Sequence, residues 1–222
     1  MTSPPLLLGH RGARAVKTVA ENTLLAFDLA LAHGCDGFEF DVRRSADSHA
    51  VVCHDPEIGG VQIASANAAQ MSALPLLSDV LQRYRHAAFL DIELKEPGLE
   101  TIAASLLRQY TPSRGYVVSS FLPEVLRALN RLDRALPLGL ICDTKAQLAQ
   151  WRGLPIAYLI PHQRLALRRL LREIHDGGKK VLVWTVNNSA DMKRLAKWGA
   201  DGIISDETEK LARTLRSGIR RQ

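Results

Sequence analysis

Two carboxylates, Glu39 and Asp41, lie two residues apart in the segment Gly37-Phe38-Glu39-Phe40-Asp41. Side chains alternate along a β-strand, so the two carboxylates share one face and the two phenylalanines share the other. Adjacent carboxylates repel each other in an apolar site, and a hard divalent cation with oxygen ligands is the simplest way to neutralise both. The pattern therefore predicts a metal site on this segment.

Two histidines come directly after short apolar runs. The run at residues 6–9 ends at His10 and Arg11, and the run at residues 51–53 ends at His54. Histidine titrates near neutral pH and can take up or release a proton, which suits general acid–base catalysis. Taken alone, a histidine at a strand end is more often structural than catalytic. A catalytic site requires that both lie close to the carboxylates.

A third polar pattern runs through residues 89–95, where Asp91, Glu93 and Lys95 alternate with apolar side chains. One face of this segment therefore carries two carboxylates and an ammonium group. Glu93 and Lys95 can form a simple ion pair on that face. Trp184, near the end of another apolar run, is by itself more often a packing residue than part of a ligand site.

Apolar runs and helical patterns alternate along the whole chain. Eight runs typical of buried parallel strands cover residues 6–9, 37–41, 89–95, 116–120, 138–142, 157–160, 180–186 and 202–205. Helical patterns cover residues 23–33, 77–84, 99–109 and 165–175, and further helices follow Pro123, Ser189 and Asp206. A weaker helical pattern follows the fifth run and extends to Trp151. Eight strand–helix units predict an α/β fold closed into a (β/α)8 TIM barrel. The alternative is an open doubly wound sheet, but no glycine-rich dinucleotide fingerprint follows any strand.

The domain organisation predicted from the sequence is a single domain over residues 1–222, with its core at 5–213. A length of 222 residues is typical of one barrel, and no linker or change of composition marks a second domain. Residues 56–74 are rich in small and amide side chains and show no periodicity. We interpret them as a short loop excursion after the second strand.

The barrel prediction brings the polar residues together, because the C-terminal ends of barrel strands meet at one mouth. The residues expected there are His10, Arg11, Glu39, Asp41, His54, Glu93, Lys95, Trp184 and Asn187. Their shared placement is stronger evidence than any of them alone. His162 and Asp206 also follow strands, and we interpret both as structural, with Asp206 as a helix cap.

Composition and charge exclude several classes of protein. The net charge is +6, with arginines concentrated near the C-terminus at Arg213, Arg216, Arg220 and Arg221. No basic stripe interleaved with aromatic residues is present, so we expect no nucleic-acid partner, and a basic surface can still attract anionic substrates. The three cysteines show no CxxC spacing, and no secretory signal or membrane-length apolar run is visible. We expect a cytoplasmic protein without stable membrane insertion; nothing in the sequence indicates its oligomeric state.

The motifs together resemble those of the glycerophosphodiester phosphodiesterase family, in its bacterial form with a short insertion. The matching segments are His10-Arg11-Gly12, Glu21-Asn22-Thr23, Glu39-x-Asp41, His54-Asp55, Glu93-x-Lys95 and Trp184-Thr185-Val186-Asn187. They agree in kind, order and approximate spacing from residue 7 to residue 206. Two features differ from the family pattern: Ala20 stands where a proline is usual, and residues 56–74 lack a long Thr-rich insertion.

The resemblance implies a TIM barrel and a role for each matching residue. It implies metal ligation by Glu39, Asp41 and Glu93, acid–base catalysis by His10 and His54, and substrate or phosphate binding by Arg11, Lys95, Glu21 and Trp184. The implied cofactor is a divalent cation, Mg²⁺ or Ca²⁺ or else Mn²⁺. The implied partner is a small-molecule glycerophosphodiester.

The implied reaction is metal-dependent hydrolysis of a glycerophosphodiester to an alcohol and sn-glycerol 3-phosphate. One histidine removes the proton of the glycerol hydroxyl beside the phosphate, and the other protonates the leaving alcohol. Water then opens the cyclic phosphate. The sequence does not assign the two roles to His10 and His54.

Three alternatives use the same residues differently. A lysophospholipase D-type or cyclising phospholipase activity would keep the site and differ only in a groove for the acyl chain. A non-catalytic barrel that binds a phosphorylated ligand would be favoured by loss of a histidine or a carboxylate, and all are present. A zinc hydrolase is disfavoured, because His10 and His54 are far apart in the sequence and the paired carboxylates prefer a harder ion.

Overall fold

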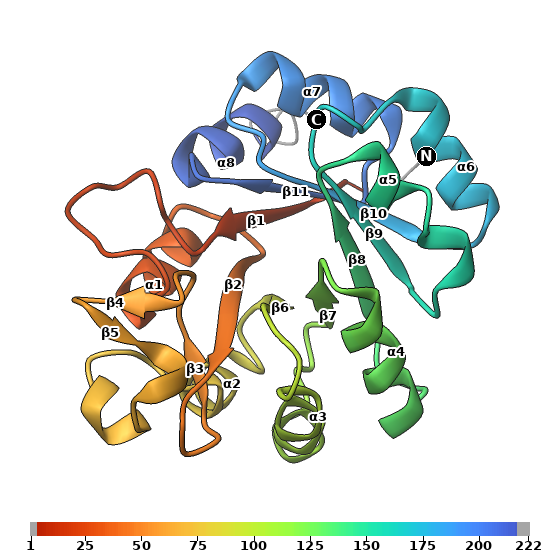
Figure 1. Ribbon diagram of the computed structural model, residues 1–222. Helices are drawn as coiled ribbons and strands as arrows, with labels where there is room; N and C mark the ends of the chain where they lie inside the picture. The colour runs from red at the N-terminus through yellow and green to blue at the C-terminus, as the bar shows by residue number, and fades with distance from the viewer. Residues whose placement is uncertain (1–3, 217–222) are drawn as a thin grey trace.

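Eight parallel strands form a closed barrel in the computed structural model, which describes residues 4–216. They are β1 (Leu6–His10), β2 (Gly37–Arg44), β6 (Phe89–Leu94), β7 (Tyr116–Ser120), β8 (Leu138–Cys142), β9 (Tyr158–Pro161), β10 (Lys180–Val183) and β11 (Gly202–Ser205). Because β1 pairs with both β2 and β11, the ring has no open edge (Figure 1). The predicted single-domain (β/α)8 barrel is confirmed. The predicted seventh strand, 180–186, ends earlier, at Val183.

Helices surround the strand ring on its outside (Figure 1). They are α1 (Leu24–Ala32), α2 (Leu77–Tyr84), α3 (Glu100–Gln109), α4 (Pro123–Leu132), α5 (Lys145–Leu148), α6 (Arg168–Asp176), α7 (Ser189–Trp198) and α8 (Thr208–Arg216). α6 begins at residue 168 rather than at the predicted 165. None of the helices between residues 4 and 216 combines the length and apolar character needed to cross a bilayer. Arg220 and Arg221 lie outside the described residues.

The predicted alternation of β2 is confirmed by what each of its faces contacts. Phe38 and Phe40 point outward into the layer between strands and helices, where Phe27 of α1 stacks on Phe38 with ring centroids 4.2 Å apart. Tyr84 of α2 meets the same ring edge-on. These aromatic contacts are apolar and fully buried, so they fix the orientation of β2. The alternate side chains, Glu39 and Asp41, are therefore directed into the barrel.

Gly37 allows β2 and β6 to lie in register. A Cβ atom at this position would come within 1.8 Å of the carbonyl oxygen of Phe89, a distance that no side chain tolerates. Gly37 therefore lies directly opposite Phe89, and the same register places Asp41 opposite Glu93. The glycine thus helps to bring carboxylates from two neighbouring strands together.

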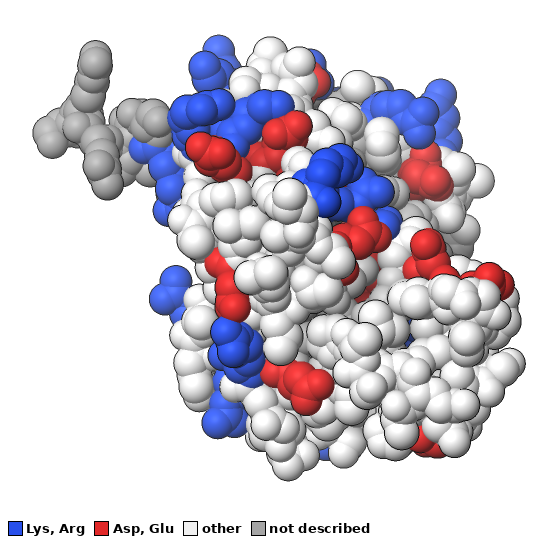
Figure 2. All heavy atoms as spheres, turned by 90° about the vertical axis from the view of Figure 1, so that its left-hand side faces the viewer, with Lys and Arg blue, Asp and Glu red and all other residues white. Residues whose placement is uncertain are grey.

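The segment after β2 is more ordered than predicted. β2 first pairs with the antiparallel β3 (Ala50–Val52). Within residues 56–74 lie the two-stranded hairpin β4 (Glu57–Ile58) and β5 (Val61–Gln62) and the short helices η1 (Ile63–Ser65) and η2 (Ala68–Met71). Interpreting the whole segment as a loop was therefore wrong. Figure 2 views the molecule from the side of α1 and this hairpin; no charged residue occurs between residues 58 and 78, and the surface there is largely white.

Candidate active site

A cavity of about 110 Å³ opens at the C-terminal end of the barrel. Its polar half comes from β1, β2, β6 and the turn after β3, and its apolar half comes from β7 to β11. The lining residues are His10, Arg11, Glu39, His54, Asp91, Glu93, Lys95, Phe121, Ile141, Ile160, Trp184 and Ile204. Seven of the nine predicted site residues are among them. Asp41 lies just behind the polar wall, and Glu21 contacts that wall from outside.

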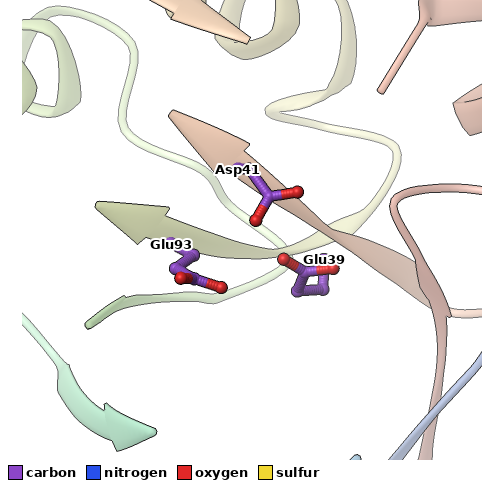
Figure 3. Close-up of side chains that lie close together, drawn as sticks. All are labelled: Glu39, Asp41 and Glu93. Carbon is purple, nitrogen blue, oxygen red and sulfur yellow. The ribbon is translucent and has the colours of Figure 1, made fainter. Parts of the chain in front are cut away.

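Three buried carboxylates from β2 and β6 point toward a common space (Figure 3). One oxygen each of Glu39, Asp41 and Glu93 lies within 4.8 Å of the other two. Burial raises the pKa of Glu39 well above its usual range, and the charges of Asp41 and Glu93 add to this effect. Oε1 of Glu39 is buried and finds no hydrogen-bond partner among the described residues. A set of oxygen donors with an unpartnered buried oxygen fits a hard divalent cation.

Two cationic side chains hold the third carboxylate in place. Asp41 forms two ion pairs. Its Oδ2 lies 3.2 Å from Nε of Arg11, and its Oδ1 lies 3.3 Å from Nζ of Lys95. Burial opposes ionisation of Asp41, but Lys95 and Arg11 outweigh it, so the pKa of Asp41 is lowered. Lys95 also pairs with Glu93 at 2.7 Å. Both cations line the cavity, where they can contact an anionic ligand.

The turn after β1 contains a strained residue, Arg11, whose backbone contacts the carboxylate cluster. Arg11 has a φ of 51°, a left-handed conformation that non-glycine residues seldom adopt. In this conformation its backbone N–H donates to Oε2 of Glu39 at 3.0 Å. Strain of this kind costs about 1–3 kcal/mol and concentrates at functional sites.

His10 is held by a carboxylate that the sequence analysis treated as structural. Its Nδ1 lies 2.7 Å from Oδ1 of Asp206, and its Nε2 faces Oε2 of Glu39 at 3.9 Å. Asp206 also accepts hydrogen bonds from Nδ2 of Asn187 at 2.7 Å and from Nη1 of Arg14 at 3.3 Å. Interpreting Asp206 as only a helix cap was therefore wrong. Its carboxylate fixes the ring of His10 and leaves Nε2 directed toward the carboxylate cluster.

His54 has a similar partner in the same polar half of the cavity. Its Nδ1 lies 2.7 Å from Oδ1 of Asp55, and its side chain is 32% exposed. Partial burial lowers the pKa of His54, although Asp41 and Asp55 oppose this shift. An imidazole with a lowered pKa is largely neutral at pH 7, so it can accept a proton. The two histidines thus share one arrangement, with a carboxylate on Nδ1 and the other nitrogen available.

The segment Glu21-Asn22-Thr23 supports the polar wall from outside. Glu21 accepts hydrogen bonds from Arg11 at 2.8 Å and from Arg14 at 2.6 Å, so it orients Arg11 without lining the cavity itself. Nδ2 of Asn22 donates to Asp41 at 2.9 Å. The side chain of Thr23 caps the N-terminus of α1. Each residue of the motif therefore has a separate structural task.

Asp91 forms part of the cavity floor and is fully buried. Its Oδ1 accepts a hydrogen bond from Ser119 at 2.6 Å, and burial raises its pKa to about 7. The alternation in residues 89–95 placed Asp91 on the same face as Glu93 and Lys95, so the signal for it was present in the sequence. No motif singled it out.

The apolar half of the cavity has an aromatic wall of fixed orientation. Nε1 of Trp184 donates to the carbonyl oxygen of Ile160 at 2.9 Å. The Trp184 ring meets Phe121 edge-on at 5.6 Å and His162 edge-on at 5.3 Å. His162 contacts Trp184 beside the mouth and does not line the cavity, and its interpretation as structural stays a prediction.

Comparison with known proteins identifies relatives over nearly the whole chain. The model of the glycerophosphoryl diester phosphodiesterase family matches residues 10–210. A glycerophosphodiester phosphodiesterase of Caldanaerobacter subterraneus subsp. tengcongensis is 28% identical over 243 residues, which span 96% of this chain and 98% of the relative.

Solved structures give the same result for the fold. A phosphodiesterase of Oleispira antarctica, solved in complex with the product sn-glycerol-3-phosphate, aligns with a TM-score of 0.83 at 27% identity, covering 96% of this chain and 97% of its own. A glycerophosphodiester phosphodiesterase of Parabacteroides distasonis aligns with a TM-score of 0.87 at 21% identity, covering 99% of this chain and 100% of its own. The barrel of this chain is thus similar to those of both proteins along their whole length.

Proposed function

Since the chain belongs to the glycerophosphoryl diester phosphodiesterase family, we propose that it hydrolyses glycerophosphodiesters to an alcohol and sn-glycerol 3-phosphate by acid–base catalysis with two histidines. The resemblance noted in the sequence is confirmed, and the chain is a phosphodiesterase of that family. The observation that carries the proposal is the cavity itself, which joins two histidines, a carboxylate cluster and two cations. The product complex of the Oleispira antarctica relative supports the choice of product.

We place a divalent cation, Mg²⁺, Ca²⁺ or Mn²⁺, on Glu39, Asp41 and Glu93. Such a cation, when bound, polarises the phosphoryl oxygens and offsets the negative charge that grows in the transition state. Arg11 and Lys95 bind the same phosphate from the cavity wall. The apolar half around Trp184 contacts the carbon skeleton of the substrate.

In the first step, one histidine accepts the proton of the glycerol 2-hydroxyl, and that oxygen attacks phosphorus. The bond between phosphorus and the leaving oxygen breaks, and the second histidine donates its proton to that oxygen. The products are the free alcohol and a five-membered cyclic glycerol phosphate. His10 and His54 suit these roles because each has a carboxylate partner on Nδ1 and its other nitrogen available.

In the second step the two histidines exchange roles. The histidine that has become neutral accepts a proton from water, and the water oxygen attacks phosphorus. The bond from phosphorus to the 2-oxygen of glycerol breaks, and the protonated histidine returns its proton to that oxygen. The product is glycerol 3-phosphate, and both histidines recover their starting states.

We expect Asp206→Asn to lower kcat by at least about 10²-fold, because Asn keeps the shape of the side chain but removes the negative charge that orients His10. KM for a glycerophosphodiester should change little, since Asp206 lies behind His10. The matched control is Asp201→Asn. Asp201 pairs with His175 at 2.8 Å before β11 begins, at the other end of the barrel. An equal loss in both variants would show that Asp206 has only a structural role.

The reaction itself is tested with glycerophosphocholine, glycerophosphoethanolamine and glycerophosphoglycerol, with glycerol 3-phosphate detected by a coupled dehydrogenase. We expect kcat/KM values within about tenfold of one another, a spread of roughly 1.4 kcal/mol. The reason is that the segment after His54 has no charged residue between positions 58 and 78 to select a headgroup. Release of phosphocholine instead of choline would contradict the proposal.

A diester of 1,3-propanediol tests the cyclic intermediate, since it lacks the 2-hydroxyl that we place as the nucleophile. It should bind and inhibit competitively without being cleaved at a measurable rate. Cleavage at a rate close to that of the glycerol diester would show that water attacks directly, and the first step above would then be wrong.

One observation favours the lysophospholipase D-type alternative. The β4–β5 hairpin follows directly after His54, and its Ile58 and Val61 are 44% and 48% exposed. Exposed apolar side chains beside a cavity can contact an acyl chain. Lysophosphatidylcholine belongs in the same substrate panel, and release of choline from it would establish this second activity.

A further inference from the structure

A groove between α5 and α6 combines apolar and cationic side chains. It is a shallow depression of about 310 Å³. Its apolar residues include Leu148, Leu165 and Leu170. Its charged residues are Lys145, Arg152, Arg169 and one carboxylate, Glu173. We call it the α5–α6 groove. The reaction proposed above uses none of these residues.

The α5–α6 groove lies on the same end of the barrel as the cavity. α5 begins three residues after the C-terminal end of β8, and the segment between β9 and α6 carries Gln163. The backbone N–H of Gln163 donates to the carbonyl oxygen of Trp184 at 2.6 Å. The side-chain Nε2 of Gln163 donates to the carbonyl oxygen of Thr185 at 2.7 Å. The groove is therefore joined to the aromatic wall of the cavity, and a surface that covers the groove lies close to the mouth.

The charge around this groove is mainly positive. Between residues 143 and 173 the chain carries six Lys and Arg side chains and two acidic residues, Asp143 and Glu173, of which Glu173 pairs with Arg152. In the described part of the chain, Arg168 and Arg169 form no ion pair, although both are exposed. Next to them Leu167 is 62% exposed, as much as any large apolar side chain recorded. Leu167 also lines the groove and extends its apolar surface beside these arginines. A contiguous apolar patch bordered by cations indicates a partner that is both anionic and apolar.

We propose that this end of the molecule docks on an anionic lipid bilayer through the α5–α6 groove and the exposed Leu167. Cations bind the lipid phosphates while the leucine enters the boundary between headgroups and acyl chains. The cavity then faces the same bilayer. We favour a membrane over an acidic protein because, if the proposed function is correct, the substrate is the polar part of a phospholipid, and docking places the mouth where such molecules are released.

The test is sedimentation of the full-length protein with vesicles of phosphatidylcholine alone or phosphatidylcholine mixed with phosphatidylglycerol. Each cation near an anionic surface contributes about fivefold to binding. The double variant Leu167→Glu with Arg168→Glu should therefore reduce the partition onto anionic vesicles by at least about tenfold. High salt should weaken binding of the wild type in the same way.

The matched control is Arg131→Glu with Leu132→Glu. These neighbours are also an exposed arginine and an exposed leucine, but they lie at the C-terminal end of α4, at the opposite end of the barrel. The control should bind vesicles like the wild type. Both double variants should cleave water-soluble glycerophosphocholine at the wild-type rate, which also shows that they are folded.

Three outcomes would overturn the proposal. The first is equal binding of the wild type to anionic and neutral vesicles. The second is an equal loss of binding in both double variants. The third is binding of the wild type to polyglutamate but not to vesicles, which would identify an acidic protein as the partner. Sedimentation does not depend on catalysis, so failure of the proposed function would appear only in the hydrolysis assay.

Discussion

His10→Ala and His54→Ala should each reduce kcat for glycerophosphocholine by about 10²–10⁴-fold, the usual contribution of general acid–base catalysis. Both imidazoles border the cavity, and each is oriented by a carboxylate at 2.7 Å. Removing one leaves the cations and the carboxylate cluster in place, so substrate binding should largely survive. Steady-state kinetics separates the effect on kcat from that on KM.

The control for this pair is His162→Ala, because His162 lies at the rim against Trp184 and has no role in the proposed proton transfers. It should retain most of the activity. The double variant of His10 and His54 should lose little more activity than either single variant, since the two residues act as a unit.

A diester with a p-nitrophenol leaving group assigns the two roles. p-Nitrophenolate leaves without being protonated, so the variant whose defect shrinks with this substrate is the one that lacks the general acid. Near wild-type rates in either single variant would remove that histidine from the mechanism.

The fold could be predicted because each barrel strand is a short apolar run followed by a helix or a turn. All eight predicted runs correspond to barrel strands, since parallel strands buried on both faces are mostly apolar. β2 and β6 depart from this where carboxylates point into the barrel. The β4–β5 hairpin could not be found in this way. Its strands are two residues long and exposed, so they are too short to show a periodicity or an apolar run.

The candidate site was predictable where its residues belong to strands. The alternation of polar and apolar residues showed that Glu39 and Asp41 share one face of their strand and that Glu93 points away from its apolar neighbours. In a barrel the C-terminal ends of the strands meet at one mouth, which predicted that these carboxylates lie close together. Asp206 was missed because its partner His10 is 196 residues away, and only closure of the ring between β1 and β11 brings the two together. A contact of this kind leaves no local pattern in a single sequence.

Asp91 was missed for a different reason. Its position on the strand face was visible, but its burial and its hydrogen bond to Ser119 depend on the depth of the barrel interior. The alternation along a strand shows which face a side chain occupies, but not how far below the mouth of the barrel it lies. A carboxylate at the open mouth and one on the cavity floor therefore look alike in the sequence.

Removing divalent cations with excess chelator should abolish hydrolysis, and adding Mg²⁺, Ca²⁺ or Mn²⁺ should restore it. The carboxylates of Glu39, Asp41 and Glu93 offer only oxygen ligands, which these cations prefer. Burial and mutual repulsion make the cluster unfavourable when it is ionised without a counter-charge, so a bound cation stabilises it. Full turnover by metal-stripped protein in excess chelator would disprove the metal site.

Glu39→Gln tests the same site without relying on activity. The substitution keeps the size of the side chain and removes one negative charge, so affinity for Mn²⁺, measured by calorimetry, should fall by more than about 100-fold. That loss exceeds the 10–100-fold typical of residues that only support metal ligands. The matched control is Glu21→Gln. Glu21 pairs with Arg11 in the same network but lies outside the three-carboxylate cluster. Because Glu21 acts on the cation only through Arg11, its variant should keep Mn²⁺ affinity within about tenfold of the wild type, and equal losses in the two variants would place the cation elsewhere.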